Sequence, residues 1–430
     1  MDCTLTFHTG AGTGIQRVVR RYADGLLEIA AAHDVHVVPV RISGGQLVPL
    51  PIVDNRVAFP VADAARSEER KDRFQQRLDF VRGVGHRANF VRSRAFARWL
   101  DAGPNGRGLA RSARSLAPAA DASGSLQLAR GDILLLLDSS WVYDVRSVLD
   151  AAGRAGVIRA AVLCDVLPLR HPEWFTNGTR NYFEDWIQAL LPRLEGVVAI
   201  SEATCRDLAM LVATERIQSP RMPSCSAVHL GAEIAAAPDA AAVRPELRNL
   251  LASDQPPAFL TVGTLEPRKN VDFALDLFER LLARGLDLQW HVIGSAGWLS
   301  DGTADRIRAH PEFGTRLFWW TDLKDGELAW AYRHAGALVA ISRAEGFGLP
   351  LVEARLAGLP VFASDIPVFR EIMQGEATYL PLDRPSLAAA ALEDFLARGA
   401  PRPSEASRIA RTWGESTMEL LARLQRLAVD

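Results

Sequence analysis

Two glutamates mark the ends of the segment EGFGLPLVE, residues 345–353. The segment follows an apolar run typical of a buried strand, so we expect it at the carboxyl edge of a sheet. Gly346 and Gly348 let the backbone approach a ligand, and the helix expected next offers free amides to a phosphate. Glu345 and Glu353 could then accept hydrogen bonds from sugar or ribose hydroxyls. In the competing interpretation, Glu353 only complements the helix dipole and Glu345 is a solvated loop residue.

Two cations occupy a second loop of this kind, VGTLEPRKN, residues 262–270. Arg268 and Lys269 lie where a strand is expected to turn into a helix, and there they could neutralise a diphosphate. Lysine is rare in this chain, since Lys71 and Lys324 are the only others. The competing interpretation is an ordinary polar loop.

A glycine-rich turn, HTGAGTGIQRVV, spans residues 8–19. Such turns can cradle a phosphate, and they also suggest a dinucleotide fold. That fold expects an acidic residue at the end of the second strand, to hold the ribose. The corresponding stretch, PVRIS at 39–43, has none, which argues against NAD.

Polar groups also follow another apolar run, in CDVLPLRHPEWF, residues 164–175. Asp165 and His171 could orient or deprotonate an acceptor hydroxyl, although we favour a surface role for His171. Ser201, in ISEAT, is a good cap for the helix expected after it.

Several motifs are absent from the sequence. It contains no Asp-x-Asp triplet, P-loop, HExxH or GxSxG. We therefore expect no metal and no cofactor, and protein cations would stabilise a leaving diphosphate.

Short apolar runs alternate with amphipathic segments in two series. The first has expected strands at 2–7, 35–42, 132–138, 157–163 and 196–200, and helices at 15–32, 144–154, 180–192 and 202–213. The second has expected strands at 258–263, 288–294, 315–320, 336–341 and 359–363, and helices at 270–284, 326–334, 350–357 and 385–398. Strand–helix alternation predicts parallel sheets covered on both faces. The Ala/Pro-rich stretch 234–257 reads as a linker, so we expect an α/β protein of two doubly wound domains with the ligand between them.

Composition fits a large cytoplasmic protein. The chain has 430 residues, 48% of them hydrophobic, and a net charge of −2, which gives no sign of nucleic-acid binding. Four scattered cysteines indicate reduced thiols. We expect no membrane span and no secretion signal, because there is neither an 18-residue apolar run nor a basic leader.

One region is locally basic. Residues 65–130 carry 14 Lys and Arg against 6 Asp and Glu, and Arg17, Arg20 and Arg21 add to this charge. A solvated helix face is the default interpretation, and peripheral contact with anionic lipid headgroups is the alternative. Within this region, the Gly/Ala/Ser-rich residues 103–128 predict a loop or insertion.

Together these motifs resemble glycosyltransferase family 4, a group of retaining enzymes with the two-domain GT-B fold. The segments 262–270, 342–354 and 357–372 look like the donor half of that family. TGIQRVVR at 13–20 and the CDVLPLRHPEWF…AISEATCRDL pattern look like the acceptor half of enzymes that build bacterial surface polysaccharides.

The resemblance implies domains and a reaction. An acceptor domain would cover 1–235, a nucleotide-sugar domain 236–406, and a final helix within 407–430 would cross back onto the first domain. The enzyme would move a hexose, with retention and without a metal, from a nucleotide diphosphate sugar to a glycan or lipid-linked glycan. GDP-mannose is the donor that the resemblance favours.

The resemblance also implies roles for individual residues. The catalytic set would be Glu345, Lys269, Arg268 and Asp165, with Glu345 on the donor sugar and the two cations on the diphosphate. Glu353 would hold the ribose hydroxyls. The other donor-binding residues would be Gly346, Phe347 and Gly348 near the sugar, Gly12 and Gly14 beside the diphosphate, Thr264 in the phosphate loop, and Trp320 and Thr321 near the base.

The chain departs from the family pattern at two positions. Many relatives carry Arg in place of Thr264 and His in place of Cys164, so Arg268 would have to serve the first role and His171 or His8 the second. Alternatives to the transferase are a nucleotide-sugar epimerase or phosphorylase on the same architecture, and a sugar- or lipid-binding subunit that has lost activity.

Overall fold

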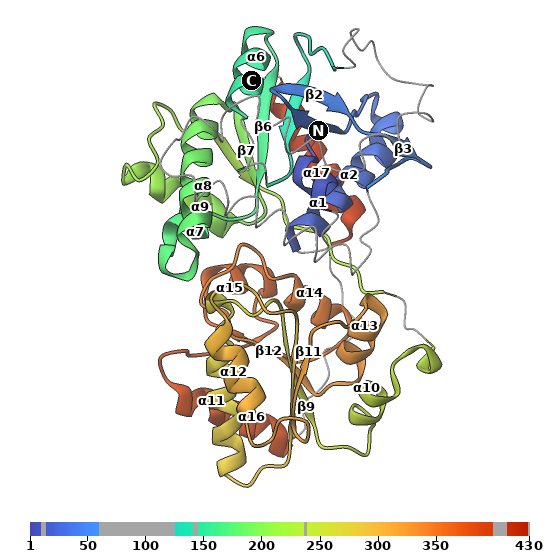
Figure 1. The fold of residues 1–430 in the computed structure, drawn as a ribbon, viewed down its shortest axis with the longest axis vertical. Coiled ribbons are helices and arrows are strands. Elements are labelled where there is room, and N and C mark those ends of the chain that lie inside the picture. The colour runs from blue at the N-terminus through green and yellow to red at the C-terminus, as the bar shows by residue number, and fades with distance from the viewer. Residues whose placement is uncertain are drawn as a thin grey trace.

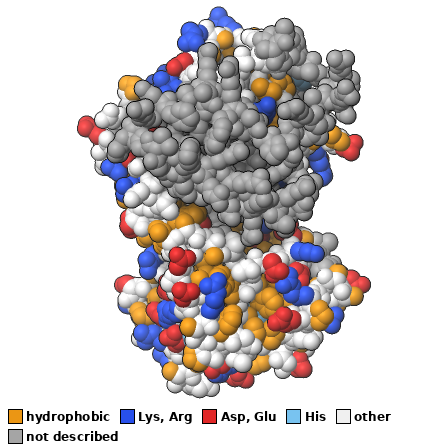
Figure 2. Space-filling model, viewed as in Figure 1, with side chains coloured by type: hydrophobic (Ala, Val, Ile, Leu, Met, Phe, Trp, Pro, Cys, Tyr) orange, Lys and Arg blue, Asp and Glu red, His pale blue; other side chains and the backbone are white. Residues whose placement is uncertain are grey.

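The chain folds into two lobes (Figure 1). The structure, a computed structural model, describes residues 1–9, 14–59, 125–139, 141, 145–235, 239–398 and 411–428. Among these residues, no helix is both long enough and apolar enough to cross a bilayer. On the face shown in Figure 2, the second lobe carries acidic, basic and apolar side chains intermixed.

The second lobe is built on a parallel sheet with the strand order β11-β10-β9-β12-β13-β14. Its strands are β9 (Ala258–Val262), β10 (Gln289–Ile293), β11 (Leu317–Trp320), β12 (Ala337–Ala340), β13 (Val361–Ser364) and β14 (Thr378–Leu380). Its helices are α10 (Pro245–Leu250), α11 (Val271–Ala283), α12 (Asp301–Ala309), α13 (Asp325–His334), α14 (Leu349–Leu356), α15 (Pro367–Met373) and α16 (Pro385–Arg398). This strand order is that of a doubly wound nucleotide-binding fold.

The first lobe is also parallel at its centre, with the order β5-β6-β7-β8. Its strands are β1 (Val40–Ser43), β2 (Gln46–Pro49), β3 (Ile52–Val53), β4 (Arg56–Val57), β5 (Ile133–Leu136), β6 (Ile158–Leu163), β7 (Gly196–Ala199) and β8 (Ser224–Ala227). Its helices are α1 (Thr4–Thr9), α2 (Gly14–Ala30), α6 (Arg146–Arg154), α7 (Leu167–Arg170), α8 (Asn177–Leu190) and α9 (Glu202–Ala213). The prediction of an α/β fold with two doubly wound halves is confirmed.

The expected strand at 2–7 is wrong. Asp2 bridges Val40 and Leu136 in the sheet, but helix α1 begins at Thr4. Two buried carboxylates fix this start: Asp2 accepts the Thr4 amide at 3.0 Å, and Asp138 accepts the Thr6 amide at 2.6 Å. A short apolar run has no periodicity to distinguish helix from strand, so this outcome was beyond pattern reasoning.

Other elements differ from expectation. The strand expected at 35–42 begins only at Val40 and forms an antiparallel hairpin with β2. The expected linker 234–257 contains helix α10, and Arg244 anchors its start by donating to Glu327 at 2.7 Å. The hairpins, β8, β14, α7, α12 and α15 were not anticipated.

The final helix α17 (Trp413–Leu427) returns to the first lobe, where it packs against α2 and β7 (Figure 1). The hydroxyls of Tyr22 and Ser416 lie 2.8 Å apart, and the rings of Tyr22 and Trp413 meet edge to face.

Candidate functional site

The candidate site begins at two neighbouring strands, β9 and β12, which pair in parallel at the centre of the second sheet. Here the strand order reverses, and in doubly wound sheets ligands bind in the crevice beyond this point. The loop after β9 carries Arg268 and Lys269, and the loop after β12 carries Glu345 to Gly348. Both loops singled out from the sequence therefore meet at one place.

An ionic cluster joins these loops. Glu345 pairs with the Arg268 guanidinium, and one of its oxygens lies 2.5 Å from Lys269 Nζ. Ser342 donates to the same carboxylate at 2.8 Å, and Arg268 Nε donates to Glu266 at 2.8 Å. Glu345 thus fixes the positions of two cations, Arg268 and Lys269, at the carboxyl edge of the sheet.

Glycine geometry shapes both loops. Gly263 has φ +141°, and a Cβ there would lie 3.0 Å from Cε of Lys269, so the lysine side chain passes directly over the bare backbone. Gly348 has φ +113° and precedes α14, where a Cβ would lie 2.8 Å from the ring of Phe369. Both conformations favour glycine over any L side chain.

The charges in the cluster are strongly coupled. Burial raises the pKa of Glu345, but Arg268 and Lys269 lower it more, to about 2. Burial raises the pKa values of Glu266 and Asp165, and Arg268 opposes both shifts. Glu345 is thus the most acidic carboxyl of the cluster, while Asp165 has a greater tendency to hold a proton than an exposed aspartate.

The first lobe contributes Asp165 to the same place. A Cβ on Gly346 would lie 2.2 Å from the carbonyl oxygen of Cys164 and 3.1 Å from Cβ of Asp165, so the two loops are in contact. Asp165 also accepts the Leu167 amide at 3.0 Å. Burial and the Asp165 charge raise the pKa of the Cys164 thiol to about 12, which keeps the thiol neutral.

A second contact between the lobes lies nearby. Glu371, on α15, accepts the amides of Glu202 and Ala203 at the start of α9, at 2.7 and 2.9 Å. The same carboxylate lies 2.7 Å from Nε2 of His229. A carboxylate at a helix N-terminus accepts hydrogen bonds from the free amides and interacts favourably with the helix dipole. We call the set of contacts that Glu371 makes with the two amides and His229 the Glu371 clasp, and it stabilises the contact of the two lobes.

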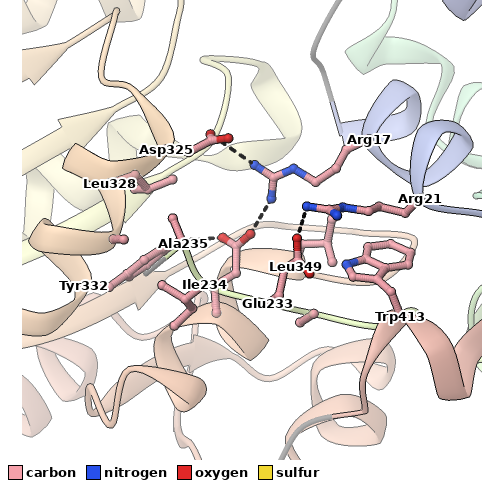
Figure 3. Close-up of a pocket in the computed structure, with 13 residues that line it drawn as sticks. Arg17, Arg21, Glu233, Ile234, Ala235, Asp325, Leu328, Tyr332, Leu349 and Trp413 are labelled. Carbon is pink, nitrogen blue, oxygen red and sulfur yellow. Dashed lines mark hydrogen bonds and ion pairs between the residues drawn. The ribbon is translucent and has the colours of Figure 1, made fainter. Parts of the chain in front are cut away.

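Glu353 lies on α14 at a pocket between the lobes. It pairs with Arg17 of α2 and accepts the Tyr332 hydroxyl at 3.0 Å. Figure 3 shows Arg17 and Arg21 entering the pocket from α2, the first directed at Asp325 and the second at Glu233. The pocket is also lined by Leu328, Ala329, Leu349 and Trp413, among others.

The remaining predicted residues lie at different places. Trp320 is buried at the end of β11 and donates from Nε1 to His291 at 3.0 Å, while Thr321 is exposed. The methyl group of Thr264 packs beside Gly297. Gly14 begins α2, and among the described residues no atom lies within 4 Å of a Cβ built on it.

The glycine-rich turn and the acceptor half include both described residues and residues outside the description. Gly12 and the side chain of His8 lie outside the described residues. His171 stacks on Trp174 with ring centroids 4.1 Å apart. Most of the basic segment 65–130 also lies outside the described part. Two arginines that add to the same positive charge have partners within the protein: Arg20 lies over the Phe59 ring, and Arg21 pairs with Glu233.

Sequence reasoning missed four residues of these sites: Arg17, Tyr332, His229 and Glu371. Arg17 was noted only for its charge, although it lies inside TGIQRVVR. Tyr332 and His229 carry no motif signal, because only the packing of α13 and of the chain after β8 brings them to the cleft.

Comparison with protein-family models identifies the family to which the second lobe is similar. Residues 243–413 match the model described as "Glycosyl transferases group 1". This segment belongs to the glycosyl transferases group 1. The group 1 segment includes both loops of the ionic cluster and Glu353.

The chain is similar to curated relatives over a longer stretch. It is 33% identical over 308 residues to the serotype-specific mannosyltransferase WbdA of Escherichia coli, a match that covers 70% of this chain and 38% of WbdA. It is 36% identical over 135 residues to the phosphatidyl-myo-inositol mannosyltransferase of Mycobacterium tuberculosis, covering 30% of this chain and 34% of the relative. By sequence, the chain is thus a homologue of glycosyltransferases of the bacterial polysaccharide type, and it spans well under half of their length.

One solved structure shows the same fold. The pneumococcal O-GlcNAc transferase GtfA, solved with UDP and GlcNAc, superposes with a TM-score of 0.50 at 18% identity, covering 70% of this chain and 58% of that one. The group 1 segment is therefore the second half of a GT-B fold.

Proposed function

We propose that the protein is a retaining glycosyltransferase that moves a hexose from a nucleotide diphosphate sugar to a glycan or lipid-linked glycan in bacterial surface polysaccharide synthesis. The observation that carries this proposal is the convergence of Arg268 and Lys269 on Glu345 at the switch point of the second sheet. Two cations fixed at this position can stabilise the charge that develops on a departing diphosphate.

The donor is proposed to be GDP-mannose. Three relatives of different kinds support this choice, because they are named as mannosyltransferases: WbdA, the phosphatidyl-myo-inositol enzyme and the O-antigen chain mannosyltransferase B of Escherichia coli. The nucleotide would lie in the pocket beside Glu353, with its ribose hydroxyls on that carboxylate and its base toward Trp320 and Thr321. Glu345 would contact the sugar, near the backbone of Gly346, Phe347 and Gly348.

The proposed reaction needs no nucleophile from the protein. The bond between the anomeric carbon and the diphosphate oxygen breaks, and the acceptor oxygen bonds to that carbon on the same face. The acceptor proton passes to the departing diphosphate oxygen. Asp165 would orient the acceptor hydroxyl from the first lobe, and Arg268 and Lys269 would bind the diphosphate in place of a metal.

The proposed domain limits are 1–235 for acceptor binding, 236–406 for donor binding and 407–430 for the returning helix. We propose a cytoplasmic location, with peripheral membrane contact through the basic segment 65–130 if the acceptor is lipid-linked. No role in nucleic-acid binding is proposed.

Thermal-shift measurements with GDP, UDP, dTDP and NAD, each in EDTA, test the central claim. One nucleoside diphosphate should stabilise the wild type, and Glu353→Ala should abolish this shift. Turnover of the matching nucleotide mannose in EDTA then tests the donor and the metal-free mechanism. A shift with NAD alone, or with none of the four, would refute the proposed transferase.

A further inference from the structure

Each carboxylate oxygen of Glu353 has a partner within the protein. Arg17 binds one oxygen, and the Tyr332 hydroxyl donates to the other at 3.0 Å. The Glu353 side chain is only 8% exposed. Each oxygen could accept a second hydrogen bond, but the side chain is too covered to be approached freely, so we expect ribose hydroxyls to displace one of its present partners.

Burial decides which partner leaves. Tyr332 is 1% exposed, and burial raises the pKa of its hydroxyl well above the usual range, so it remains a protonated donor. A buried hydroxyl without a partner would be unfavourable. Arg17, in contrast, is 35% exposed and reaches the pocket from the other lobe, so water can solvate its guanidinium when it moves away.

The surroundings of Arg17 favour an anion as its next partner. Arg17 lies in the first turn of α2, a helix of 17 residues that begins at Gly14, and its guanidinium enters the pocket (Figure 3). Its second carboxylate, Asp325, is 3.9 Å away and 87% exposed, so that pair is weak. A guanidinium binds phosphate oxygens in the same bidentate manner as it binds a carboxylate.

We propose that Arg17 is a donor-binding residue that exchanges partners: it pairs with Glu353 in the structure described above, and it passes to the donor diphosphate when ribose hydroxyls take its place at that carboxylate. The inference rests on the proposed function, because it assumes a nucleotide at Glu353. Arg17 then adds a cation from the first lobe to the two that the second lobe supplies, so that donor binding draws on both lobes.

The exchange has opposite consequences for two kinds of ligand. A nucleoside without phosphates must displace Arg17 and gives it no new partner. A nucleoside diphosphate displaces Arg17 and then binds it. Removal of the guanidinium should therefore weaken diphosphate binding but leave nucleoside binding equal or stronger.

Calorimetric titration of wild type, Arg17→Ala and Arg17→Lys with GDP and with guanosine tests the proposal, or UDP and uridine if the wild type prefers UDP. Arg17→Ala should raise the Kd for the diphosphate about 10-fold, the loss of one charge-assisted contact, while the nucleoside Kd stays equal or falls. Arg20→Ala is the matched control: it removes the same charge from α2, but Arg20 lies over the Phe59 ring and does not line the pocket. It should change both Kd values less than about 2-fold.

Other outcomes separate the claims. If Arg17→Ala weakens the binding of nucleoside and diphosphate equally, Arg17 has only a structural role. If the substitution tightens the binding of both ligands, Arg17 only blocks the pocket. Either result overturns the proposed exchange of partners. If Arg17→Ala is unstable, Arg17→Lys decides, because it keeps a charge for Glu353 but loses the bidentate fork, and only diphosphate binding should weaken. A wild type that binds no nucleoside diphosphate would overturn the proposed function together with this inference.

Discussion

The hydroxyl of Ser201 donates a hydrogen bond of 2.8 Å to the carbonyl oxygen of Gly346. Ser201 caps helix α9 of the first lobe, accepting the Thr204 amide at 3.1 Å, and Gly346 lies in the loop after β12 of the second lobe. The loop that carries Glu345 is therefore held by the opposite lobe as well as by its own sheet.

Gly346→Ala should separate this loop from the first lobe. The added Cβ would lie 2.2 Å from the carbonyl oxygen of Cys164, a backbone atom that cannot move aside cheaply. We expect turnover to fall about 10²-fold or more, because small displacements of reacting groups have effects of this size. Steady-state rates measure it.

The matched control for this substitution is Gly302→Ala. Gly302 lies in α12, and no atom of the described part of the chain lies within 4 Å of an added Cβ, so alanine should leave turnover unchanged and slightly stabilise the helix. Normal turnover in Gly346→Ala would show that the observed contact of the two loops is not needed for catalysis.

Lys269→Ala should lower kcat by about 10²-fold with KM changed much less, since the ammonium group is proposed to act on charge that develops during departure of the diphosphate. Lys324→Ala, a substitution of the same type at the start of α13, serves as the control and should retain the wild-type rate. A near-normal kcat for Lys269→Ala would remove this lysine from the catalytic set.

Pattern reasoning predicted the second lobe well and the start of the first lobe poorly, and the reason is physical. Strands β9, β10 and β12 are buried, mostly apolar segments followed by helices, and this alternation is typical of parallel sheets. Because parallel strands end at one edge, the loops with Lys269 and Glu345 could be placed at the same edge of the sheet, whereas the pairing of β9 with β12 that joins them comes from the structure. In contrast, the helical state of residues 4–9 depends on Asp138, more than a hundred positions away.

The pairing of Arg17 with Glu353 was equally beyond the sequence. Each residue lies in a recognisable motif, but the contact depends on how the two lobes meet, and no local pattern encodes that. Likewise, Glu371 lies in the segment 357–372 that resembles the donor half, but the resemblance implies no role for it, and only the meeting of α15 with α9 gives it four polar neighbours.

Glu371→Ala should destabilise the protein measurably. The substitution leaves two amides of α9 and His229 without their carboxylate, which costs about 2 kcal/mol for a charged group of this kind. We expect the Tm to fall by about 3–6 °C in a calorimetric scan. Glu393→Ala removes an exposed partner of Arg284 instead, and it should shift the Tm by less than about 1 °C. Equal shifts for the two variants would show that the Glu371 clasp contributes no more than a surface ion pair.

Asp2→Asn should stabilise the protein more at pH 8 than at pH 5. Burial, helped by the Asp138 charge, raises the pKa of Asp2 to about 7. In the unfolded chain the pKa of this carboxyl is 3.8, so at pH values between 3.8 and about 7 the folded state binds a proton that the unfolded state has lost. Stability conferred by this site therefore falls as pH rises from about 4 to 7.

Melting curves of wild type and Asp2→Asn across this pH range measure the effect. The asparagine stays neutral and can still accept the Thr4 amide, so the Tm difference should grow by a few degrees with rising pH. A difference that is constant with pH would show that Asp2 is already ionised in the folded protein at pH 5.

Because α17 returns to the first lobe, the chain passes between the lobes twice, and the two connecting segments lie side by side. The amide of Ala232, on the outgoing segment, donates to the carbonyl of Arg411, on the incoming one, at 2.9 Å. Gly231 lies so close to Trp413 that a Cβ would be 2.4 Å from its backbone. Because the two connections are bonded to each other there, a hinge rotation of the lobes about this junction would preserve the Ala232–Arg411 hydrogen bond. A shear motion of one lobe along the other would break that bond.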